Sequence, residues 1–99
     1  MTTPDERGRN LIWGREALDV LSTDAELPQG WRAESASLLD RYPPLSVLKS
    51  CSAADLDLLQ VEHSHELAAA RALFQRLRVS PTCSEQRKYT LLVILRHFY

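Results

Sequence analysis

The chain has 99 residues, of which 44% are hydrophobic and 25% are charged, and its formal net charge is −1. This composition excludes a disordered chain, and three glycines are too few for a turn-rich β-sandwich. The length predicts a single domain over residues 1–99, small enough to gain stability from association.

Neither a signal peptide nor a membrane span is predicted. Residues 1–10 are polar, and no apolar run approaches the roughly 20 residues that cross a bilayer. The two cysteines, Cys51 and Cys83, are too few for a disulfide framework. We therefore expect a cytoplasmic protein with reduced thiols and no membrane contact.

The first helix is predicted over residues 4–22. Thr3 can cap it, Pro4 suits its first position, and Glu6 completes a capping box. Its apolar stripe consists of Leu11, Gly14, Leu18 and Leu21, with Trp13, Ala17 and Val20 beside it. A second helix is predicted to open at Pro28 and to stop at Pro43-Pro44, because proline disfavours a helical residue before it.

Three further segments are predicted to be helical. A short turn covers residues 45–50, and a long helix follows from a cap at Ser52 to about residue 78. The stretch 62–66 (EHSHE) is the weak point of that helix, and the pattern leaves open whether it breaks there. Thr82 and Glu85 repeat the capping pattern, and a fourth main helix follows over 84–98.

The last segment has a strand alternative, since its tyrosine, threonine, valine and isoleucine side chains favour strands. A helix is preferred, because no second strand is available and a lone strand leaves its backbone groups unsatisfied. The predicted fold is therefore an all-α bundle of four main helices, arranged as two helical hairpins, with a short extra turn near residues 45–50.

Residues 2–44 resemble small uncharacterised bacterial proteins. Those proteins begin with a T-x-P-x-E-R-x-R pattern and end their second helix with an Arg-aromatic-Pro motif. The matching positions are Thr3, Pro4, Glu6, Arg7, Arg9, Leu11, Trp13, Pro28, Leu39, Arg41, Tyr42 and Pro43. The resemblance implies a soluble bacterial helical protein and no particular activity, and it does not extend over residues 45–99.

The histidines and cysteines offer weak signals for catalysis. Glu62 and His65 have the E-x-x-H spacing of di-iron bundles, but a second such pair is absent, and so is the H-E-x-x-H of zinc proteases. A metal or thiol enzyme using His63, His65 or Cys83 is the third alternative. We expect no catalytic residue, no metal and no cofactor.

A nucleic-acid-binding protein is the second alternative. Residues 70–92 resemble a helix-turn-helix, with a cationic group near its turn that consists of Arg71, Arg76, Arg78, Arg87 and Lys88. A recognition helix presents polar side chains to the bases, whereas the second helix here has LLVIL (91–95) in its middle. The overall charge is also not basic. Nucleic acid is therefore an unfavoured partner.

The LLVIL run cannot be confined to one face of a helix. Either this helix is central in the bundle, or another chain covers its outer side, and a second copy is the simplest cover. The predicted homodimer interface consists of Tyr89, Leu92, Val93, Leu95, Arg96, Tyr99, Trp13 and Trp31. We expect a non-catalytic protein-interaction module, such as an anti-activator, an antitoxin-like protein or an immunity-like protein, that binds another protein.

Overall fold

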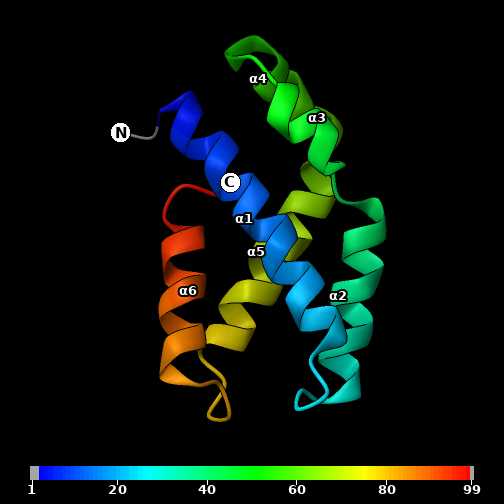
Figure 1. The fold of residues 1–99 in the computed structure, drawn as a ribbon, viewed down its shortest axis with the longest axis vertical. Coiled ribbons are helices and arrows are strands. Elements are labelled where there is room, and N and C mark those ends of the chain that lie inside the picture. The colour runs from blue at the N-terminus through cyan, green and yellow to red at the C-terminus, as the bar shows by residue number, and fades with distance from the viewer. Residues whose placement is uncertain (1–2, 99) are drawn as a thin grey trace.

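The computed structural model describes residues 3–98, which contain six helices and no strand (Figure 1). The helices are α1 (Pro4–Thr23), α2 (Gln29–Arg41), α3 (Leu45–Ser50), α4 (Ala53–Glu62), α5 (Ser64–Arg78) and α6 (Glu85–Leu95). The all-α class is confirmed, and the strand alternative for the last segment is wrong. The arrangement as two hairpins of four main helices remains a prediction.

Side-chain caps mark the starts of α1, α4 and α6. The Thr3 hydroxyl accepts a hydrogen bond from the Glu6 backbone N–H, and the Glu6 carboxylate accepts one from the Thr3 N–H. This is the predicted capping box, and Ser52 forms an equivalent one with Asp55. The start of α6 differs from the prediction, because the hydroxyl of Ser84, and not that of Thr82, accepts from the first turn.

The long helix predicted over residues 52–78 is broken at His63, inside its predicted weak point. The backbone N–H of His63 donates to the carbonyl of Leu59, and the carbonyl of His63 accepts from the N–H of Leu67. Both distances are 2.9 Å. The backbone hydrogen bonds of α4 therefore end at His63 and those of α5 begin there. The two helices follow each other without a connecting loop.

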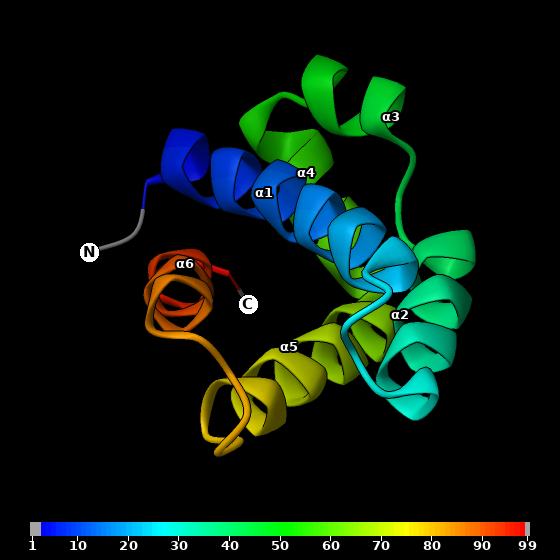
Figure 2. The ribbon, with the colours of Figure 1, turned by 60° about the horizontal axis from the view of Figure 1, so that its bottom comes forward.

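The six helices form a layered globule with α1 running through its centre. In Figure 1, α2 and α6 lie on opposite sides of α1 and α5 crosses behind it, and Figure 2 shows α5 below α1, between α6 and α2. Helices α3 and α4 pack against the N-terminal part of α1, and α5 joins α2 to α6 across the back. One core of leucine and aromatic side chains fills the space between them.

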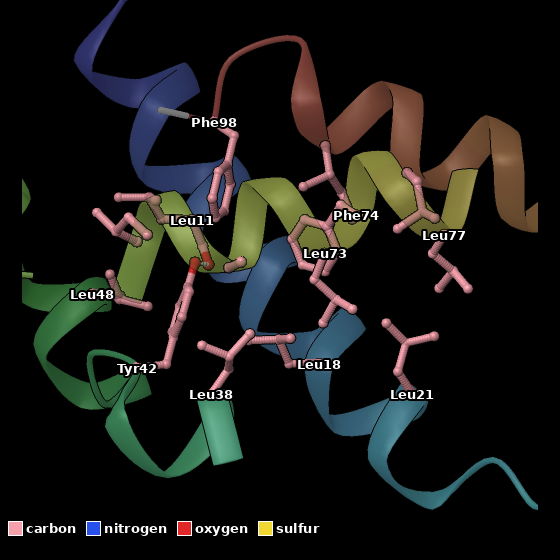
Figure 3. Packing of buried hydrophobic residues seen from close by; sticks show 14 of the residues in the cluster. Leu11, Leu18, Leu21, Leu38, Tyr42, Leu48, Leu73, Phe74, Leu77 and Phe98 are labelled. Atoms are coloured by element: carbon pink, nitrogen blue, oxygen red, sulfur yellow. Dashed lines mark hydrogen bonds between the residues drawn. The ribbon is translucent and has the colours of Figure 1, made fainter. Parts of the chain in front are cut away.

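The centre of this core is a close contact between α1 and the C-terminal end of the chain. The ring of Phe98 lies edge-on to Phe74, with centroids 5.7 Å apart, and stacks on Tyr42 at 6.5 Å (Figure 3). A Cβ atom on Gly14 would lie 2.5 Å from Phe98 Cε1 and 2.9 Å from the Tyr42 hydroxyl. The packing therefore requires glycine at position 14.

A hydrogen bond completes the contact. The Tyr42 hydroxyl donates to the backbone carbonyl of Leu11 at 2.6 Å. Burial of the phenol raises the pKa of Tyr42, which keeps this donor protonated. The predicted end of the last helix at residue 98 is wrong: α6 ends at Leu95, and the chain then turns so that Phe98 enters the core.

Gly14→Ala should destabilise the protein by about 1 to 3 kcal/mol, because the added methyl group overlaps a rigid ring. Gly8→Ala is the matched control: it is also inside α1, and nothing lies within 4 Å of its Cβ position. That change should stabilise by about 0.5 to 1 kcal/mol, since alanine favours a helix. Urea unfolding followed by circular dichroism measures both, and equal effects would contradict the packing described above.

Candidate protein-binding surface on α1 and α6

Helix α6 lies at the edge of the molecule and not at its centre (Figures 1 and 2). It packs mainly on α1 and α5. Leu91 and Ile94 are buried in the core, whereas Leu92 is 43% exposed and Tyr89 is 68% exposed. The alternative of a central closing helix is therefore wrong, and the outer side of α6 is open in a single chain.

The C-terminal end of α6 is fastened by a buried amide from α1. Asn10 is fully buried, and its side-chain amide donates to the backbone carbonyls of Val93 and Ile94 at 3.0 and 2.9 Å. The last carbonyls of a helix lack partners within the helix, so Asn10 acts as a cap supplied from another helix. Sequence reasoning missed this residue. The available signal was a polar side chain one turn before Gly14 on the apolar stripe.

The N-terminal end of α6 is fastened by an ion pair. The Arg87 guanidinium contacts the carboxylate of Asp24, which lies in the α1–α2 loop. The hydrogen bond that Arg87 donates is the main reason why the pKa of Asp24 lies below its ordinary value of 3.8. A second hydrogen bond, from the Glu26 backbone N–H, lowers the pKa further. With Asn10 near Ile94 and Asp24 near Arg87, α1 and α6 run antiparallel.

A groove opens between the two helices and their fastened ends. Its volume is about 580 Å³. Trp13, Ala17 and Val20 form the wall from α1 and Tyr89, Thr90 and Val93 form the wall from α6. The lining is mainly apolar, and Glu16 lies on the α1 rim. Val20 on the α1 wall is 58% exposed and Tyr89 on the α6 wall is 68% exposed, so each wall carries a large apolar side chain that water reaches.

The structure brings three of the predicted interface residues into this groove: Trp13, Tyr89 and Val93. The others lie elsewhere. Leu92 and Arg96 are exposed, and Leu95 is half-buried against the core. Trp31 lies on α2, away from the groove, where the Arg76 guanidinium stands 5.6 Å from its ring centre. Tyr99 lies outside the described residues.

A second, smaller groove lies on the other side of Trp13. Its volume is about 380 Å³, and it separates the N-terminal half of α1 from α3 and α4. The Arg9 guanidinium covers the Trp13 ring at 4.6 Å. Cys51 lines this groove, and burial, together with the charge of Asp55, raises the pKa of its thiol. A raised pKa disfavours the thiolate that nucleophilic catalysis needs.

The predicted cationic group is partly neutralised by carboxylates. Arg76 forms a two-pronged contact with Glu34 at 2.7 and 3.0 Å. Arg87 is paired with Asp24, and the Lys88 amine lies 3.6 Å from the Glu85 carboxylate. Arg78 is half-buried and Arg71 is exposed on α5. The group therefore presents less net positive charge than the sequence alone indicates.

The remaining chemical signals are scattered. His63 is half-buried at the α4–α5 break, and His65 is exposed. Within residues 3–98, no three histidine, cysteine, aspartate or glutamate side chains converge as a metal site would require. None of the helices in that range is both long and apolar enough to span a bilayer.

Comparisons with protein-family models, with curated proteins and with solved structures found no match. The resemblance of residues 2–44 to small bacterial proteins receives no support from them.

Asn10→Leu should destabilise the protein by about 2 kcal/mol, because it keeps the volume but leaves two carbonyls at the end of α6 without a donor. Ser35→Ala is the control. Ser35 is equally buried, but its hydroxyl bonds only the Trp31 carbonyl of its own helix, so its loss should change stability by less than about 0.5 kcal/mol. Hydrogen exchange should show faster opening of α6 in the Asn10 variant alone.

Asp24→Asn should reduce the sensitivity of the fold to acid. Because the pKa of Asp24 is lowered on folding, its carboxylate contributes stability above the ordinary value of 3.8, and this contribution is lost as the pH falls through the lower folded value. The unfolding free energy of the wild type should therefore fall more steeply between about pH 5 and pH 2 than that of the variant. Identical slopes in urea titrations over that range would contradict the ion pair.

Proposed function

We propose that this chain is a non-catalytic protein-interaction module, a small cytoplasmic regulator or inhibitor that acts by binding another protein. The observation that carries the proposal is the apolar groove between α1 and α6, with Val20 and Tyr89 exposed on opposite walls. Exposed apolar surface of this kind, bordered by polar residues, is typical of protein-binding sites. Such a surface would suit an anti-activator, an antitoxin-like protein or an immunity-like protein.

The occupant that suits this groove is an amphipathic helix of the partner. Two antiparallel helices form its walls, so a third helix can lie between them with its apolar side chains at i, i+3, i+4 and i+7. Trp13 and Tyr89 belong to the residue types that dominate binding energies. Glu16 is an exposed acidic residue on the α1 rim, so the partner helix should carry basic residues along the edge that faces α1.

The arrangement as two hairpins is part of this proposal. Helix α1 contacts α2, and α5 contacts α6. If each pair acts as one unit, the groove lies where the α1–α2 unit meets α6, and side chains at its rim can adjust to a partner. The contact of α1 with α6 at Asn10 would then set the width of the groove.

The other two functions have weaker support. Nucleic-acid binding would need positive charge that Arg76, Arg87 and Lys88 share with carboxylates. A thiol or metal enzyme would need an activated nucleophile or a ligand cluster, and the pKa of Cys51 is shifted in the opposite direction. Both remain alternatives to the interaction module.

The test is site-specific photo-crosslinking in the cells that make the protein. A photoreactive side chain at Val20, on the groove wall, should form an adduct with a different protein. The same side chain at Val61 is the control, because Val61 is 73% exposed but lies on α4. Glu16→Lys should lower the yield at Val20 about threefold, since one rim charge is reversed.

Two outcomes contradict the proposal. One is the absence of any adduct with another protein at Val20. The other is an equal yield of the same adduct at Val20 and Val61, which would indicate nonspecific contact with exposed apolar side chains and not a groove.

A further inference from the structure

The outer side of α6 carries a stripe of side chains, of which only Tyr89 also lines the groove. Glu85, Tyr89, Leu92 and Arg96 follow one another at spacings of four, three and four residues, which places them on one face of a helix. All four are exposed, and this face points away from the core positions Leu91 and Ile94. We call these four residues the outer stripe.

The outer stripe has a polarity that makes it complementary to itself. An acidic side chain, Glu85, stands at its start with 94% of its surface exposed, and a basic one, Arg96, stands at its end. Tyr89 and Leu92 lie between them. Reading the stripe backwards exchanges Glu85 with Arg96 and Tyr89 with Leu92. An inverted copy therefore places an opposite charge beside each charged residue of the stripe. It also places an apolar side chain beside each of the two central residues.

We propose that the outer stripe binds the outer stripe of a second copy in antiparallel orientation, about a two-fold axis that passes between Tyr89 and Leu92. Each Glu85 then meets Arg96 of the other copy, and each Tyr89 meets Leu92 of the other copy. This inference rests on the proposed function in one respect, because it also treats the α6 side of the molecule as a protein-binding surface. It assigns the stripe to self-association and leaves the groove to the partner helix.

Charge selects the antiparallel orientation. A parallel pair would place Glu85 beside its own counterpart and Arg96 beside its own counterpart, and like charges across an interface weaken association. The antiparallel pair also places the positive N-terminal end of each helix dipole beside the negative C-terminal end of the other. A two-fold axis closes the assembly at two copies, because the same patch is used on both sides.

The size of the contact indicates a reversible dimer. Helix α6 has 11 residues, which corresponds to a length of about 16 Å. Two such helices side by side bury an area at the low end of specific interfaces, so dissociation is expected at micromolar concentrations. The apolar centre supplies most of the attraction, and the two charge pairs set orientation and register.

Charge reversal tests this arrangement in purified protein. Glu85→Arg and Arg96→Glu should each weaken self-association about tenfold, because the two-fold axis turns one substitution into two repulsive contacts. The double variant Glu85→Arg/Arg96→Glu should associate within about twofold of the wild type, since it restores both pairs with their signs exchanged. Sedimentation equilibrium up to on the order of 100 µM measures all four proteins.

A second pair of variants keeps the test independent of helix-end effects. Leu92→Glu should abolish the dimer, because it places a charge beside the two-fold axis. Val61→Glu, at an apolar position on α4 that is more exposed than Leu92, should leave it intact. Far-UV circular dichroism should show the same helix content in every variant.

The proposal is overturned if the wild type is a monomer at these concentrations, if the single reversals associate as tightly as the wild type, or if the double variant stays as weak as the single ones. Its failure can be separated from failure of the proposed function. A monomeric protein that still forms the Val20 adduct in cells refutes the dimer alone. A dimer without any Val20 adduct refutes the partner groove alone.

Discussion

Gly14 allows the ring of Phe98 to lie against the backbone of α1, and the position of α6 depends on that contact. The end of the chain is thereby drawn into the core beside Tyr42, and Asn10 can reach the last carbonyls of α6. The start of α6 is fixed separately by Arg87. Because α6 is held at both ends and by two inward side chains, its remaining faces need no cover from the rest of the chain. Those uncovered faces form the α6 wall of the groove and the outer stripe.

Local signals in the sequence predicted most of the helices. The capping boxes at Thr3 and Ser52, the double proline after Tyr42 and the weak point near His63 all act within a few residues, so they can be read without the fold. The LLVIL run was misleading for the opposite reason. Its apolar character suggested a helix enclosed on all sides, but which sides are enclosed depends on α1 and α5, which lie far away in sequence.

The residues of the candidate surface were also predictable only where local sequence signals identify them, and not where distant contacts decide. Tyr89 was predicted because it flanks the apolar run, Val93 because it belongs to that run, and Trp13 because it borders the stripe of α1. Trp31 had the same appearance in the sequence. In the fold, its ring is covered by Arg76, which Glu34 holds from the side, a contact between residues more than forty positions apart. Asn10 escaped prediction because its partners are backbone carbonyls, which carry no sequence signature.

Tyr89 links the two proposed surfaces, since its ring belongs both to the α6 wall of the groove and to the outer stripe. A partner helix that draws the ring into the groove removes it from the stripe, and a second copy that packs on the stripe removes it from the groove. Binding of either occupant must then weaken binding of the other by the same factor, because linkage is reciprocal. Self-association through α6 would therefore serve as a reservoir that releases monomers as the partner accumulates.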